Sequence, residues 1–133
     1  MAYATDMPAA ARRHFGAAET LSNSTRRDVA GYLYGIAVEC AIKAMMLDAG
    51  LRPLPPGNRR DDPFYAHFPD LRTMLRDKLG GRMSAPLSHL INNDSFMNQW
   101  ATEMRYSNGR DIKEAWVVAW QEQARQAIAG IGT

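Results

Sequence analysis

Residues 26–48 are apolar on nearly every face of a helix, and this feature constrains the fold more than any other. Within this segment's apolar run the only charged residues are Glu39 and Lys43. A helix that is hydrophobic all round belongs in the interior of a bundle rather than on its surface. Residues 26–48 are therefore predicted to be the central helix, with Gly50 in the position of a C-cap glycine.

Four further segments place apolar residues at steps of three and four, which is the spacing of one helix face. The first begins after Asp6, a predicted N-cap, and has Pro8 in its opening turn. Thr25 is the predicted cap of the central helix. The other segments cover about residues 68–79, 84–106 and 111–128.

Breaks in these patterns predict where the helices end. Gly80 and Gly81 are expected to stop the third helix, and residues 92–95 to kink or interrupt the fourth before its apolar face resumes. Residues 107–109 are a predicted turn. No segment shows the alternation of a β-strand. The predicted fold is all-α, a four- to five-helix up-and-down antiparallel bundle.

A long connection is predicted at about residues 51–66, because Pro53, Pro55, Pro56 and Pro63 exclude a continuous helix. Such connections are often functional or mobile, although spanning the bundle from end to end explains this one equally well. The 133 residues suffice for one hydrophobic core, so residues 1–133 are expected to form a single domain.

Composition excludes several classes of protein. No apolar run approaches the ~20 residues of a membrane span, and the first 21 residues lack the apolar stretch of a signal peptide. A cytoplasmic protein without a membrane role is therefore expected. Cys40 is the only cysteine, so an internal disulfide is excluded and a buried, unreactive thiol is expected.

Arginine accounts for 13 of the 16 cationic residues, although the net charge is only +2. This net charge is too small to indicate a polyanionic partner. The planar guanidinium suits recognition of phosphates and bases, but codon bias in a GC-rich genome would also explain the excess. Both explanations stay open at this point.

Arg105 and Arg110 are the best candidates for phosphate binding, because they lie close to the predicted start of the last helix, where amides and dipole favour an anion. Tyr106 is expected to stack on a base, and Asn108 completes the candidate turn. The alternative is an ordinary interhelical turn with solvated arginines and a packed tyrosine.

Glu39 and Lys43 form a second candidate, because two charges in an apolar helix must find partners. Their four-residue spacing predicts a structural salt bridge. The alternative is a polar lining of a central or dimer cleft, facing Arg105.

No metal site is predicted, because His14, His67 and His89 lie in different segments, none four residues from another. His67 is expected to bond backbone at a helix start or to sit at the edge of a cleft. Cofactor-binding and nucleophile motifs are absent, so no cofactor is expected. Core or dimer-interface positions are expected for Trp100, Trp116, Trp120, Met45, Met46, Met97 and Met104.

Three sequence elements occur in a recognisable order. An aromatic residue, Tyr32, is followed by Ala37, Glu39, Ala41, Lys43 and Ala44; then come His67-Phe68-Pro69-Asp70-Leu71 and finally Arg105-Tyr106. In this order they resemble the second helix, the His-x-Leu opening of the third helix and the Arg-Tyr element of HEPN domains. The resemblance covers most of the chain.

The HEPN resemblance implies a helical bundle that usually dimerises and is often encoded beside a nucleotidyltransferase, in toxin–antitoxin or defence modules. Active members cleave RNA with an Arg-x(4–6)-His motif assembled across the dimer, while others are thought to bind nucleotides. Arg105 matches the arginine, but no histidine follows it. Arginine, with a pKa of ~12.5 or above, is a poor base at neutral pH.

The favoured hypothesis is therefore a HEPN-like homodimer that binds a nucleotide or RNA near Arg105 without strong catalysis. One alternative is a non-enzymatic dimerisation or protein-interaction module, suggested by the large apolar surface of the second and last helices. A metal-independent endoribonuclease is the less favoured alternative.

Overall fold

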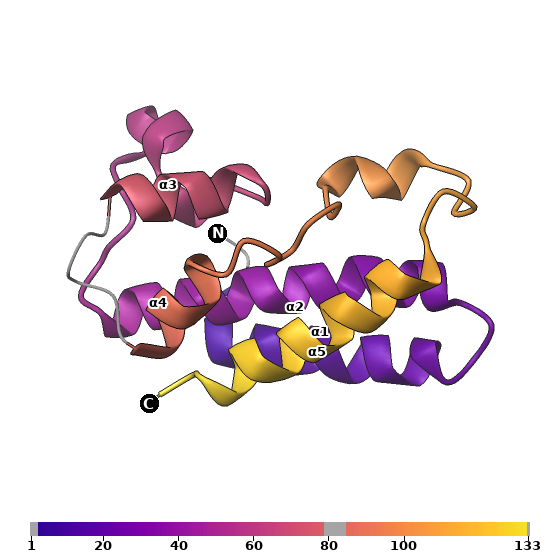
Figure 1. The fold of residues 1–133 in the computed structure, drawn as a ribbon. Helices are drawn as coiled ribbons and strands as arrows, with labels where there is room; N and C mark the ends of the chain where they lie inside the picture. Colours follow the sequence, from indigo (N-terminus) through magenta and orange to yellow (C-terminus); the bar gives the residue numbers. More distant parts are fainter. Residues whose placement is uncertain (1–2, 79–84, 133) are drawn as a thin grey trace.

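The computed structural model describes residues 3–78 and 85–132, and in that part of the chain every regular element is helical (Figure 1). The α-helices are α1 (Met7–Ser22), α2 (Arg27–Asp48), α3 (Asp70–Lys78), α4 (Ala85–Ile91) and α5 (Glu114–Ala129). Short 3-10 helices are η1 (Pro56–Asp61), η2 (Pro63–Tyr65) and η4 (Thr102–Tyr106). The prediction of an all-α helical bundle is confirmed.

The central helix is α2, which packs against both α1 and α5, and α1 and α5 also contact each other (Figure 1). Its buried residues include Tyr34, Val38 and Ile42, each with no exposed side-chain surface. By length and composition α2 could cross a membrane, with a mean hydropathy of 1.3 in its most apolar window. Because 72% of that window is buried inside the molecule, the packing of the bundle accounts for its apolar character.

Local sequence signals explain the start of α1 and the end of α2. Asp6 caps α1, and its Oδ1 accepts the N–H of Ala9 at 3.0 Å, as predicted. Gly50 follows α2 with a φ of +93°, the left-handed conformation expected after a helix end. The prediction for Thr25 is wrong: the N-cap of α2 is Arg26, which makes no side-chain capping bond. The backbone N–H of Arg26 instead donates to Ser24 Oγ at 3.3 Å.

The long connection is present, and Asp62 holds it in place. The side chain of Asp62 is 1% exposed, and its two oxygens accept the backbone N–H groups of Leu54 at 2.8 Å and Phe64 at 3.0 Å. A carboxylate that accepts two amide hydrogens satisfies backbone donors that would otherwise be unpaired in this segment. Asp62 therefore ties two parts of the connection to each other.

The predicted interruption of the fourth helix is confirmed, but its resumption as a helix up to Tyr106 is wrong. Residues 92–101 are irregular, Met97 and Gln99 have positive φ values of 56° and 72°, and only the short η4 follows. The reason is tertiary: the N–H of Met97 donates to Gln123 Oε1 at 2.7 Å, and the Trp100 indole donates to the carbonyl oxygen of Gly31 at 3.2 Å. The Met97 bond takes the place of a helical backbone bond, and the indole bond fixes the Trp100 side chain against α2.

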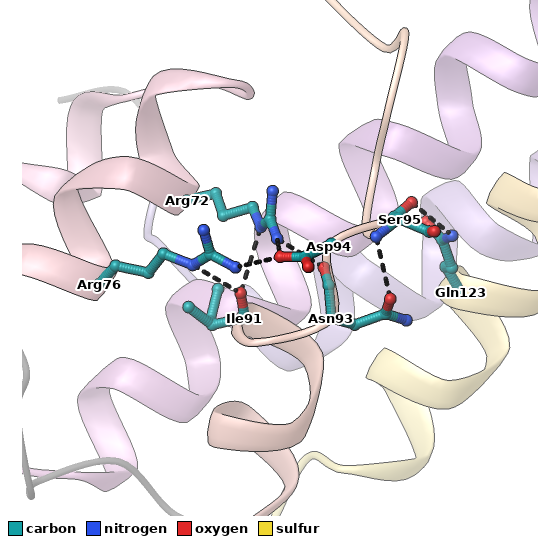
Figure 2. Close-up of polar contacts among 7 residues, drawn as sticks. All are labelled: Arg72, Arg76, Ile91, Asn93, Asp94, Ser95 and Gln123. Atoms are coloured by element: carbon teal, nitrogen blue, oxygen red, sulfur yellow. Dashed lines mark hydrogen bonds and ion pairs between the residues drawn. The ribbon is translucent and has the colours of Figure 1, made fainter.

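Two arginines one helical turn apart join α3 to the end of α4 (Figure 2). The Nε atoms of Arg72 and Arg76 both donate to the Ile91 carbonyl oxygen, at 3.1 and 3.2 Å. Asp94 lies 3.5 Å from one guanidinium and 3.1 Å from the other. Burial, followed by the neighbouring Arg76, lowers the pKa of Arg72. The arrangement caps the free carbonyls at the end of α4.

Four other predicted helix boundaries either differ from the structure or lie outside the described residues. The third helix begins at Asp70, two residues after Phe68, and the last begins at Glu114 rather than near residue 111. The predicted stop at Gly80 and Gly81 and the predicted helix start at residue 84 fall in the part of the chain that the structure does not describe.

The predicted core is largely confirmed. Trp100, Trp120, Met45, Met46 and Met97 are at most 3% exposed, whereas Trp116 and Met104 are partly buried at its edge. Cys40 is also partly rather than fully buried. Burial raises the pKa of its thiol, which disfavours the thiolate that a reactive cysteine requires.

Candidate functional site

A groove of about 320 Å³ lies where η4 and the turn after it approach the N-terminal end of α2. It is lined from α2 and the residue before it by Arg26, Asp28, Val29 and Tyr32, and from the other side by Met104, Arg105, Ser107, Asn108, Gly109 and Ile112. The structure thus brings two of the predicted site residues, Arg105 and Asn108, to one place. Arg110 is exposed but does not line the groove.

The turn approaches α2 closely because residue 109 is glycine. Gly109 has a φ of +88°, and a Cβ atom at this position would lie 2.4 Å from Asp28 Oδ2. Within the turn, Asn108 Oδ1 accepts the N–H of Arg110 at 2.9 Å. Asn108 therefore shapes the backbone of the turn.

The Arg105 guanidinium lies over two aromatic rings. Its guanidinium carbon is 5.1 Å from the centre of the Tyr106 ring and 6.0 Å from that of Tyr32. Its Nε donates to the Thr102 carbonyl oxygen at 3.1 Å, and no ion pair joins Arg105 to any described residue. Tyr106 is 79% exposed, so its ring is available to a ligand.

Tyr32 also lines the groove, although the sequence did not single it out as a ligand. Its ring stacks on Trp100, with 5.5 Å between ring centres and 14° between planes. Trp100 is itself buried and held by hydrogen bonds from its indole N–H to the carbonyl oxygens of Gly31 and Tyr32. The side of the groove that faces Arg105 is consequently rigid. The only feature of the sequence that pointed to Tyr32 was its place at the start of the HEPN-like pattern.

The expected contribution of the last helix to anion binding remains a prediction, and the start of this helix already carries an acidic residue. The first turn of α5 contains Glu114, whose carboxylate pairs with Arg27. The hydrogen bond to Glu114 is the main reason why the pKa of Arg27 is raised. An acidic residue in the first turn of a helix is itself favoured by the helix dipole.

Glu39 lies in a different place from Arg105 and does not pair with Lys43. Its Oε1 is 2.8 Å from His67 Nδ1, and its Oε2 accepts the N–H of Phe68 at 2.9 Å. No ion pair between Glu39 and Lys43 occurs among the described residues. The expectation that His67 sits at the edge of a cleft is confirmed, because it lines a second groove.

Lys43 is 7% exposed, and burial is the main cause of its lowered pKa, only partly offset by Glu39. Burial therefore destabilises the charged ammonium in the folded state. We expect Lys43→Met to raise the free energy of unfolding by about 1 kcal/mol at neutral pH. Chemical denaturation of both proteins measures this difference.

The same substitution has a predicted pH dependence. Because the folded-state pKa of Lys43 lies below the unfolded value, the unfolded chain binds more protons between these two pKa values. The stability of the wild type should therefore rise, relative to Lys43→Met, as pH increases through this window towards 10.5. A difference between the two proteins that is constant with pH would contradict the burial of a charged lysine.

The other histidines do not extend either groove into a metal site. His14 contacts Arg13, and burial, followed by that arginine, lowers its pKa. His89 is exposed on α4. Over residues 3–78 and 85–132, no group of three potential ligands from histidine, cysteine, aspartate and glutamate is close enough to hold a metal ion.

The chain was also compared with known proteins. No protein-family model, no curated protein and no solved structure matches it, and the HEPN resemblance remains a prediction.

Proposed function

We propose that the groove around Arg105 binds a nucleotide, either free or as part of a single-stranded RNA. The observation that carries the proposal is an exposed arginine whose guanidinium lies over two tyrosine rings, with no acidic partner among the described residues. The terminal nitrogens of Arg105 provide paired donors for phosphate oxygens. The exposed ring of Tyr106 provides a face on which a base can stack.

Binding without cleavage is the form of the proposal that the groove supports. Its one lining carboxylate, on Asp28, lies 2.7 Å from the guanidinium of Arg26 and is thereby committed to an ion pair. No histidine lines the groove. Cleavage of RNA without a metal requires a base for the 2′-hydroxyl and an acid for the leaving oxygen, and the groove's own side chains offer no evident pair.

The proposal extends to a HEPN-type homodimer with a nucleotidyltransferase-type partner in a toxin–antitoxin or defence module. Its support is the order of the three sequence elements together with the all-α bundle. The rival hypothesis, a protein-interaction module, loses part of its motivation, because α2 is buried by α1 and α5. On α2 and α5 the protein exposes two large apolar residues, Val29, which lines the groove, and Val118.

We expect Arg105→Ala to weaken the binding of a fluorescein-labelled single-stranded RNA by about tenfold or more, the effect of losing a charge-assisted hydrogen bond. Fluorescence anisotropy at fixed salt measures this change. Tyr106→Ala should weaken binding by a similar factor if a base stacks on the ring.

Arg52→Ala is the matched control. Arg52 follows the far end of α2, whose last residue, Asp48, lies about 24 Å from Tyr32 along the helix at 1.5 Å per residue, and Arg52 is also exposed. The proposal predicts unchanged RNA binding for this variant. Equal losses of RNA affinity in Arg52→Ala and Arg105→Ala would indicate unspecific charge attraction and contradict a site at Arg105. The proposal would also be wrong if the wild type bound neither ATP nor RNA at millimolar concentration.

A further inference from the structure

A second groove, of about 330 Å³, lies between the long connection and the start of α3. Its lining includes Arg59, Arg60 and Tyr65 from the connection, His67 and Asp70 at the start of α3, and Glu103 from η4. The His67 side chain is 53% exposed, and the carboxylate behind it, on Glu39, is 4% exposed. A deeply buried acid thus holds a half-exposed histidine at the edge of a groove.

The hydrogen bonds of Glu39 determine which nitrogen of His67 carries the hydrogen. Oε2 accepts the backbone N–H of Phe68 at 2.9 Å, and Oε1 lies 2.8 Å from His67 Nδ1. An ionised carboxylate only accepts, so Nδ1 is the donor and carries the hydrogen. In the neutral ring the lone pair is then on Nε2, the other ring nitrogen. No described residue makes a hydrogen bond to Nε2.

Two cations of the same groove have no acidic partner among the described residues. Neither Arg59 nor Arg60 forms an ion pair there, and Arg59 lies over the Tyr65 ring at 4.8 Å. The one buried acid beside them, Asp62, already accepts two backbone N–H groups. The guanidinium groups are therefore available to bind the oxygens of a phosphoryl group.

We propose that His67 is a phosphoryl-accepting residue. Its Nε2 lone pair attacks the phosphorus of a small phosphoryl donor, the bond from phosphorus to the leaving atom breaks, and the leaving group departs with that electron pair. With phosphoramidate as donor, the P–N bond breaks and the nitrogen leaves as ammonia. Arg59 and Arg60 bind the phosphoryl oxygens during the transfer.

Glu39 is the positioning residue in this scheme. Attack through Nε2 leaves a positive charge on the ring, and the Nδ1–H then faces the Glu39 carboxylate, which stabilises that charge. The proposal is independent of nucleotide binding at Arg105, because it involves another groove and other residues.

The test is a competition among the histidines of one chain. The full chain is incubated with potassium phosphoramidate at neutral pH, and phosphorylation is mapped by mass spectrometry under alkaline conditions, because phosphohistidine is labile to acid. His89, exposed on α4 without a described carboxylate partner, is the internal reference. We expect His67 to react faster than His89 by about tenfold, the effect typical of a residue that orients a functional imidazole.

Variants separate a chemical role from a structural one. Glu39→Gln should remove most of the advantage of His67 over His89, and nitrogen-15 spectra of the imidazoles should show loss of the Nδ1–H tautomer. Arg60→Ala leaves both hydrogen bonds of Glu39 in place, so this variant tests the proposal even if Glu39→Gln does not fold. Arg60→Ala should slow phosphorylation of His67 and leave that of His89 unchanged. RNA anisotropy on the same samples reports on the Arg105 groove separately. Equal rates at His67 and His89 in the wild type would overturn the proposal.

Discussion

Gly35→Ala is expected to destabilise the fold by about 3 kcal/mol or more, at the upper end of the cost of overpacking a core. A Cβ atom on residue 35 would lie 1.9 Å from both Cε2 and Nε1 of Trp100. The indole cannot easily give way, because it is 1% exposed and donates a hydrogen bond to the carbonyl oxygen of Gly31. Of a total stability of about 5–15 kcal/mol, this loss would be a large fraction.

Gly16→Ala is the control for this prediction. Gly16 is also inside a helix, α1, but a Cβ atom there would meet nothing within 4 Å. The gain in helix propensity should then appear alone and raise stability by up to ~1 kcal/mol. Urea denaturation followed by circular dichroism measures both variants. If Gly35→Ala were as stable as Gly16→Ala, the close approach of Trp100 to α2 would be wrong.

Trp120→Ala is expected to cost about 3–5 kcal/mol, the usual range for removing a large aromatic side chain from a core. Trp120 is 1% exposed, packs against Gly31 of α2, and donates from its indole to the Asn98 carbonyl oxygen at 3.0 Å. Its removal therefore leaves a cavity between α2 and α5 and an unpaired carbonyl in the irregular segment 92–101. Thermal and urea denaturation measure the loss.

Trp116 provides the comparison, because it lies one turn earlier on α5 and is only partly buried. Its ring centre is 6.2 Å from that of Trp120, and Lys113 lies over it at 5.3 Å. Trp116→Ala should cost clearly less than Trp120→Ala, since less apolar area is lost from the core. Equal costs for the two variants would contradict the packing of α5.

Helix formation in α1 and α2 could be predicted from the sequence because the signals are local. The cap at Asp6, the left-handed Gly50 and the apolar stripes depend on neighbours a few residues away. The same reasoning failed where distant partners compete for the backbone. The apolar pattern from Phe96 to Met104 is helical in spacing, but Gln123 and Gly31 bind this segment's donors in another conformation.

The candidate site shows the same division. Arg105 and Tyr106 could be predicted as candidate ligand-binding residues because they lie beside a predicted turn. Tyr32, in contrast, became part of the groove only because Trp100 orients it. The partner of Glu39 was predicted four residues away, at Lys43, and is His67, 28 residues away. The four-residue spacing rule considers only residues on the same helix. It therefore cannot predict a partner such as His67, which the long connection places beside α2.

Periodicity and composition were thus sufficient for an all-α bundle with a buried second helix, because hydrophobic burial depends on which residues are apolar and how they are spaced. Folding of the whole chain decided where the charged and aromatic groups meet. Hydrogen-bond and ion-pair partners are selected by distance and direction in space, and the long connection and the irregular segment 92–101 set those distances. The first groove is formed by α2 with η4 and the turn after it, and the second by the long connection with the start of α3 and η4, so neither exists in any one stretch of the chain.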